Sequence, residues 1–193
     1  MSKHFRQDGF SLIELLVSIV IFSVGLLAVA GLQTVSKSAN FESLQRTSAS
    51  HIANGLLEDM RTNGKGINMY LASADLGGTV IAAEPVPNCS SMGATCNAAQ
   101  KAVHDLWFWE SVIDGAHEVS AEGASGGLVQ PTLCIDGPAG GGPGIYTVSV
   151  AWRGGVSLTD SGLNTCGDGS GKYGAGNAFR RMVQVPTFLD PNI

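Results

Sequence analysis

The chain has 193 residues, of which 44% are hydrophobic and 14% are charged, and its formal net charge is −5. The hydrophobic content is sufficient for a buried core, which excludes a disordered chain, and the length allows one domain plus a long helix. The negative net charge argues against a basic surface that binds nucleic acid. We therefore expect a globular domain that does not bind nucleic acid.

The N-terminal part is the most hydrophobic. From Phe10 to Leu32 the only ionisable side chain is Glu14, and such a run is long enough to cross a bilayer as a helix. Lys3 and Arg6 precede it, which predicts a cytoplasmic leader and an exported remainder. A charged side chain in hydrocarbon costs roughly 2.5–3.5 kcal/mol on insertion scales, so it is normally paired or functional. No Lys or Arg lies at helical spacing from Glu14, and we expect its partner to be an amine created by processing.

The stretch "GFSLIELLVSIVIFSVGLL", after a short basic leader, resembles the G-F-[ST]-L-x-E signature of class III signal peptides in type IV pilins and pseudopilins. The resemblance implies that a prepilin peptidase cuts after Gly9 and that the new N-terminus at Phe10 is N-methylated. Glu14 then pairs with that amine on an adjacent subunit. The pairing is favourable because an α-amine titrates at about pH 8 and is therefore cationic in the cell. The alternative is an uncleaved anchor whose Glu14 is protonated or snorkels to the headgroups.

Beyond residue 32 the helical pattern becomes amphipathic. Gln45 and Arg46 fall largely on other faces, and "TNGKG" from Thr62 supplies a stop signal. The apolar positions are Leu44, Ala49, Ile52, Ala53, Leu56, Leu57 and Met60. We expect a leader at 1–9, a transmembrane and assembly half of the helix at 10–32, an amphipathic half at 33–62 and a globular periplasmic head at 63–193.

The head pattern predicts one further helix. Asn97 can cap it, with Gln100 at the third helical position, and Asp114-Gly115 ends it. Its apolar stripe is read as Val103, Leu106, Trp107 and Ile113. This assignment puts Trp107 in the core and leaves Trp109 as the better candidate for a surface contact.

About four antiparallel strands are expected as well. Strict alternation in "YTVSVAW" puts Tyr146, Val148, Val150 and Trp152 on one face. Gly154-Gly155 predicts a hairpin turn into a strand "VSLT", while "PTLCI" and "FRRMVQV" supply an opening and a closing strand. The fold class is therefore α+β, with a long N-terminal helix packed on an antiparallel sheet, and the resemblance implies the type IV pilin fold.

All four cysteines lie on the exported side, where an even count indicates two disulfides among three possible pairings. We favour Cys89–Cys96, which closes a short polar loop, and Cys134–Cys166, which ties a strand edge to a Gly-rich loop. No C-x-x-C pair and no His at finger spacing supports zinc.

Other polar residues form no recognisable chemical motif. His51, His104 and His117 lack the spacing of a catalytic site. Asp160, Asn164 and Asp168 could offer oxygens to calcium, although their spacing fits no EF-hand. We expect no enzymatic activity, no metal and no cofactor.

The details "GLLAVAGLQ" and "DLWFWESV", with a Cys before "YTVSVAW", resemble PilV-type minor pilins, also called type IV pilus modification proteins. The resemblance implies a low-abundance subunit that helps to prime or initiate pilus assembly. Its partners are other minor pilins and the major pilin, through the N-terminal helix, together with prepilin peptidase and an inner-membrane assembly platform. It is a single-pass inner-membrane protein with a periplasmic head before assembly and part of the extracellular pilus (fimbrium) afterwards. The alternatives are a pseudopilin of a type II secretion system and a stand-alone anchored binding protein.

We predict that the mature chain begins at Phe10. Intact-mass measurement of protein from wild-type cells should show loss of residues 1–9 and addition of a methyl group. Gly9→Val should retain the leader, because a branched side chain obstructs the extended backbone in the protease site. A wild-type chain that keeps residues 1–9 would refute processing at this junction.

Overall fold

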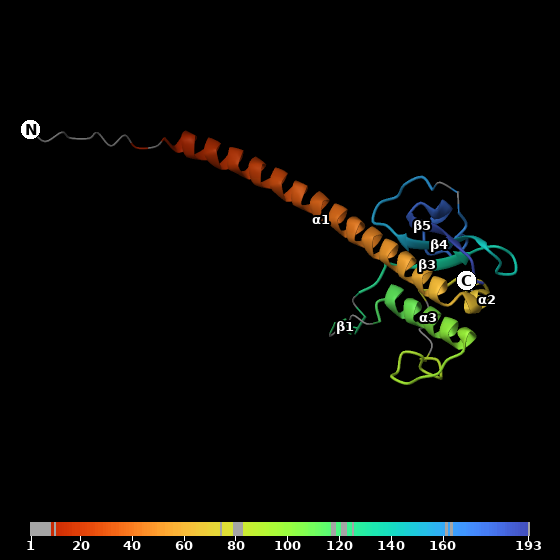
Figure 1. The fold of residues 1–193 in the computed structure, drawn as a ribbon. Helices are drawn as coiled ribbons and strands as arrows, with labels where there is room; N and C mark the ends of the chain where they lie inside the picture. Colours follow the sequence, from red (N-terminus) through yellow and green to blue (C-terminus); the bar gives the residue numbers. More distant parts are fainter. Residues whose placement is uncertain are drawn as a thin grey trace, which may run out of the picture. The chain divides into compact units, whose positions relative to one another are not determined.

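In the computed structural model of the protein, the described residues are 9, 11–73, 75–78, 83–116, 119–120, 123–124, 126–160, 162 and 164–192. The chain divides into two compact units, residues 1–41 and 42–193. Helix α1 (Leu12–Thr62) begins in the first unit and ends in the second (Figure 1).

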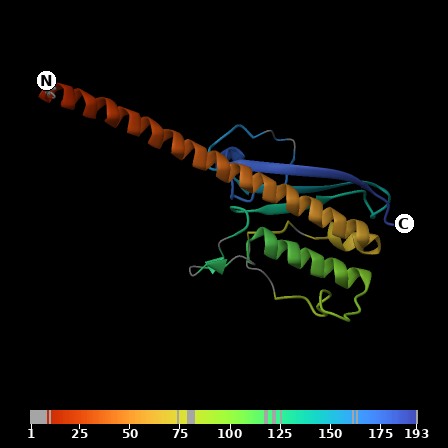
Figure 2. The same ribbon diagram turned by 60° about the vertical axis from the view of Figure 1, so that its left-hand side comes forward.

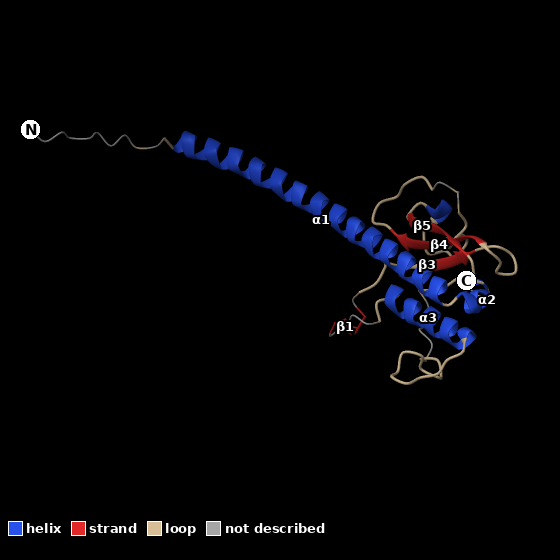
Figure 3. Cartoon of the chain, viewed as in Figure 1, coloured by secondary structure: helices blue, strands red, loops and turns tan. Residues whose placement is uncertain are grey.

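The second unit is an α+β domain, and Figure 3 shows its helices in blue and its strands in red. Its sheet has the strand order β3-β4-β5 and is antiparallel throughout, and the short strands β1 and β2 pair with each other. After α1 the elements are the 3-10 helix η1 (Gly64–Gly66), α2 (Ile67–Leu71), α3 (Ala98–Ile113), β1 (Val119–Ser120), β2 (Gly123–Ala124), β3 (Thr132–Asp136), β4 (Gly144–Arg153), the 3-10 helix η2 (Ala175–Asn177) and β5 (Arg180–Leu189).

The C-terminal part of α1 is the central layer of this domain. In Figures 1 and 2 the stretch 42–62 lies between the sheet on one side and α3 on the other. Ala49, Ala53 and Leu56 have no exposed surface, as expected for a helix that buries its apolar stripe. They belong to one core cluster with residues of α3 and β4, including Ala102, Ile113, Tyr146, Val148 and Val150.

A glycine in α1 allows α3 to approach closely. A Cβ atom at Gly55 would overlap the indole ring of Trp109, and Trp109 Nε1 donates a 2.8 Å hydrogen bond to Asp59 Oδ2. Trp109 is thus 8% exposed, whereas Trp107 is only half-buried. The sequence-based placement of these two tryptophans was wrong, because the inner stripe of α3 runs through Leu106, Trp109 and Ile113 at helical spacing.

Gln45 also departs from the expected pattern. Leu44, predicted to face the core, is 66% exposed, while Gln45 is 7% exposed. The Gln45 amide donates from Nε2 to Gly127 O at 3.2 Å and accepts at Oε1 from Val129 N at 3.0 Å. A buried amide is tolerated here because it satisfies two backbone groups of the segment that leads into β3.

The residues predicted to share one face of the central strand are buried, and Ser149 and Ala151 on its other face are buried as well. Tyr146, Val148 and Val150 are fully buried and Trp152 nearly so. β4 pairs along its whole length with β5, in register from Gly144↔Leu189 to Arg153↔Arg180, and β3 covers its other edge.

The predicted fourth strand at 156–159 does not form. Gly155 N instead bonds to Glu42 Oε1 at 2.9 Å, and Leu158 N bonds to Ala178 O at 2.7 Å. Both edges of β4 are already occupied by β3 and β5, so a hairpin partner after Gly155 has no edge to join. Among the described residues the main sheet therefore has three strands, where about four were expected.

We predict that Gly55→Val destabilises the domain by about 1–3 kcal/mol, because the added side chain overpacks the contact with Trp109. Thermal unfolding of the full chain in detergent, followed by tryptophan fluorescence, should show a lower midpoint. Asn54→Val is the matched control, since residue 54 is exposed and receives the same side chain. Equal midpoints for the two variants would contradict the packing argument.

Candidate functional site

The apolar start of α1 satisfies its own hydroxyl groups. Ser18 Oγ donates to Glu14 O and Ser23 Oγ to Ile19 O, both at 2.7 Å. Each of these two hydroxyl groups therefore has a hydrogen-bond partner within the helix and would not be left unsatisfied in hydrocarbon. By length and composition, α1 is long and apolar enough to cross a membrane.

Glu14 lies in the first turn of α1, where its backbone N–H bonds to Ser11 O at 3.0 Å. A carboxylate at this position complements the positive end of the helix dipole. Within the described part of the chain, none of the ion pairs involves Glu14. Gly9 precedes the helix, and residues 1–8 and Phe10, which carry the predicted leader and methylation site, lie outside the described residues.

The four cysteines form two disulfides, Cys89–Cys96 and Cys134–Cys166, each with a Cα–Cα distance of 5.8 Å. The first closes the loop that leads into α3, where Asn97 caps the helix in a capping box with Gln100. The second ties β3 to the loop before η2. Cys166 is 4% exposed and packs with Ala151 and Tyr173 in a second small core.

A buried polar network joins the end of α1 to α2 and α3. Tyr70 Oη donates to Asp105 Oδ2 at 2.5 Å, and Lys101 Nζ lies 2.9 Å from both oxygens of Asp105. Asn63 Nδ2 donates to Ala98 O at 2.8 Å. Burial, and next the hydrogen bond to Asp105, raise the pKa of Tyr70, so its phenol remains a neutral donor at physiological pH. The network therefore fixes helix positions instead of activating a nucleophile.

Two family models match consecutive parts of the chain. Residues 4–30 match the prokaryotic N-terminal methylation motif, and residues 31–107 match the type IV pilin Tt1218 family. Over residues 4–107 the chain is therefore similar to type IV pilins. No match was found among curated proteins or among solved structures. The methylation motif contains Gly9, Phe10 and Glu14, and the pilin match extends from the apolar half of α1 into α3.

One Ser–His contact joins α3 to the loop closed by the Cys89–Cys96 disulfide. His104 is 4% exposed, and its Nε2 lies 3.4 Å from Ser90 Oγ and 3.6 Å from Glu84 Oε1. A catalytic triad needs the acid on the opposite ring nitrogen from the nucleophile, whereas both partners here share Nε2. The contact instead attaches the disulfide loop to α3. His51 is exposed on α1, and His117 lies outside the described residues.

The three residues considered as calcium ligands, Asp160, Asn164 and Asp168, each bond to donors of the protein. Asp160 pairs with Arg180, at 2.6 Å from Oδ2 to Nη2, and Asp168 Oδ1 accepts from Asn177 Nδ2 at 2.7 Å. Asn164 Oδ1 accepts from Cys166 N at 2.6 Å. Among the residues that the structure describes, no group of three or more His, Cys, Asp or Glu side chains could hold a metal ion.

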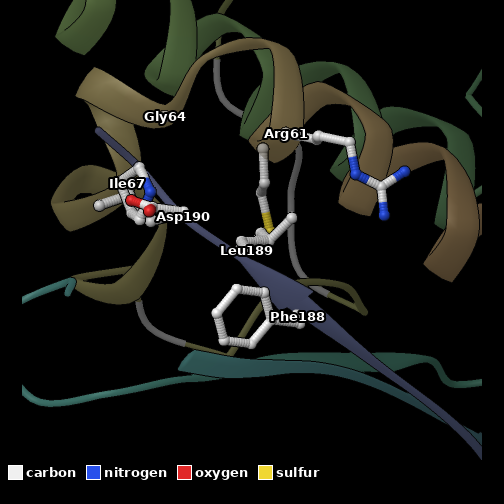
Figure 4. A pocket seen from close by; sticks show the side chains of 8 residues that line it. Arg61, Gly64, Ile67, Phe188, Leu189 and Asp190 are labelled. Carbon is white, nitrogen blue, oxygen red and sulfur yellow. The ribbon is translucent and has the colours of Figure 1, made fainter. Parts of the chain in front are cut away.

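A pocket of about 280 Å³ lies where the end of α1 meets α2 and the end of β5 (Figure 4). Its floor is apolar, and Arg61 and Asp190 are its two ionisable residues. The lining consists of Met60, Arg61, Gly64, Ile67, Phe188, Leu189, Asp190 and Pro191. Sequence reasoning missed this pocket because its residues come from distant parts of the chain.

We predict that the two disulfides contribute unequally to stability. In the chain-entropy model the Cys134–Cys166 loop is worth about 4 kcal/mol and the Cys89–Cys96 loop about 2 kcal/mol. Urea unfolding of the double alanine variants should therefore show the greater loss for Cys134/Cys166, whose removal also takes a buried sulfur from the packing around Tyr173. An equal or greater loss for Cys89/Cys96 would contradict this ranking.

Proposed function

We propose that the chain is a minor pilin of a type IV pilus, incorporated at low abundance and helping to prime assembly. The observation that carries the proposal is Glu14, a single carboxylate in the first turn of an apolar helix, within an N-terminal methylation motif. A helix that served only as an anchor would be more stable in hydrocarbon without this charge.

The proposed assembly step begins with cleavage after Gly9. Cleavage creates an α-amine at Phe10, which remains cationic after N-methylation because a secondary amine still binds a proton. This amine and the Glu14 carboxylate of an adjacent subunit neutralise each other where water is scarce. The pair sets the axial register of neighbouring helices, and a charge left unpaired would disfavour any other register.

Priming addresses a barrier at the start of assembly. The first subunits leave the bilayer without a preformed bundle to receive their apolar helices, and exposing that surface to water costs about 25 cal/mol per Å². A complex of minor pilins formed in the inner membrane supplies such a bundle. The major pilin and the assembly platform then extend it, and the head ends outside the cell on the fibre.

The head contributes to this role by protein contact and without catalysis. It contains most of the 26 glycines and several long loops, which suit a few specific neighbours better than thousands of identical contacts in an outer shell. We assign residues 1–9 to the leader, 10–32 to the membrane and assembly half of the helix, 33–62 to its amphipathic half and 63–193 to the head. The PilV-type assignment is part of the same proposal and rests on the sequence resemblance.

We predict that Glu14→Ala leaves membrane insertion and leader cleavage intact but reduces incorporation into pili, because the amine of the neighbouring Phe10 loses its partner. Immunoblots of sheared pili against the membrane fraction measure this directly. Glu58→Ala, which removes an exposed carboxylate from the same helix, is the matched control. Normal incorporation of Glu14→Ala would refute the pairing role.

We also predict that deleting the gene sharply reduces the number of surface pili while major-pilin levels in the membrane stay nearly unchanged. Blocking retraction in the same strain should restore some filaments, because rare spontaneous starts are then preserved. A strain that keeps its pili but loses type II secretion would favour the pseudopilin alternative.

A further inference from the structure

The pocket at the end of α1 carries one uncompensated charge. Asp190 Oδ1 accepts hydrogen bonds from the backbone N and the side-chain Nδ2 of Asn192, at 3.0 and 3.2 Å, and both donors are neutral. In the described part of the chain, none of the ion pairs includes Asp190. Its negative charge therefore faces the pocket without a partner cation.

The other ionisable lining residue is already engaged. Arg61 forms an ion pair with Glu58, and its Nη2 donates to Thr187 Oγ1 at 3.0 Å. Figure 4 shows its guanidinium directed away from Asp190. Arg61 thus lines the pocket mainly through its aliphatic stem, and its charge is largely neutralised by Glu58.

The walls suit an aliphatic chain that ends in a cation. Met60, Ile67 and Leu189 are buried and give an apolar floor. Phe188 lines the pocket and is 62% exposed, so its ring is accessible to a ligand. An aromatic ring and a carboxylate are the two protein groups that attract an organic cation.

We propose that this pocket receives a lysine or arginine side chain of a partner protein. The stem of that side chain lies on Ile67, Leu189 and Pro191, and its cationic head lies between the Phe188 ring and the Asp190 carboxylate. A volume of about 280 Å³ leaves room for one long side chain. That the partner is another pilin subunit rests on the proposed function, whereas the chemistry of the pocket does not.

The pocket chemistry is tested by titrating the full chain in detergent micelles with Nα-acetyl-lysine methylamide, followed by NMR. Amide signals of Ile67, Phe188 and Asp190 should shift with a millimolar dissociation constant. Nα-acetyl-norleucine methylamide, which has the same stem without the charge, should produce much smaller shifts. Equal shifts with both probes, or none with either, would overturn the proposal.

Variants separate the two attractive groups. Asp190→Asn and Phe188→Ala should each lower the affinity for the lysine probe roughly 3- to 5-fold, as expected for partly exposed ion-pair and cation–π contacts. Asp136→Asn and Val156→Ala remove an exposed carboxylate and an exposed apolar side chain outside the pocket, and should leave binding unchanged. Unchanged binding of the lysine probe in both pocket variants would show that the probe does not bind in this pocket.

The source of the cation is tested in assembled pili. A photoreactive benzoylphenylalanine at position 188 should cross-link to a pilin peptide, with the attachment point within about one helical turn of a lysine or arginine, a span of roughly four residues. A cross-link to a segment without a basic residue would contradict the proposal. Normal piliation after deletion of the gene, together with binding of the lysine probe, would refute the proposed function alone. Reduced piliation after deletion, together with no binding of the lysine probe, would refute the pocket alone.

Discussion

A carboxylate inside an apolar helix is unfavourable until a cation joins it, and this constraint links the N-terminal chemistry of the chain to the assembly that we propose for it. Hydroxyl groups in the same helix are satisfied internally, as Ser18 and Ser23 illustrate, but a charge cannot be neutralised by its own backbone. We propose that the cation is the methylated amine of Phe10 on a neighbouring chain. In that case the isolated subunit is incomplete, and association supplies the missing charge.

The domain at 42–193 depends on a different property of α1, its small and apolar inner stripe. Ala49, Ala53 and Gly55 allow the sheet and α3 to approach the helix from two sides, and Trp109 occupies the space that Gly55 leaves. Two disulfides and the network around Asp105 then fix the loops and short helices that pack less extensively. Such a domain offers a rigid surface for protein contacts.

Sequence reasoning was reliable where one strong period or motif dominated. The strand at Tyr146–Trp152 with its predicted buried face, the cap at Asn97 and the end of α1 at Thr62 are all found in the structure. Sequence reasoning failed where two faces of a helix have similar composition and tertiary contacts decide which of them is buried. Trp107 and Trp109 differ by about 200° on a helix, and the Trp109 ring packs where a side chain at Gly55 would lie. Gln45 is buried because its amide bonds to two distant backbone groups. The pocket at Phe188 and Asp190 unites segments more than a hundred residues apart, so no local pattern could indicate it.

The most direct test of the account is quantitative mass spectrometry of sheared, purified pili. It measures both the amount of this chain relative to the main subunit and the chemical state of its N-terminus. The account predicts a substoichiometric chain, present in every preparation, whose N-terminal peptide begins with N-methylated Phe10. A chain that forms the bulk of the fibre, or one that is absent from pili and retains residues 1–9 in the membrane, would contradict it.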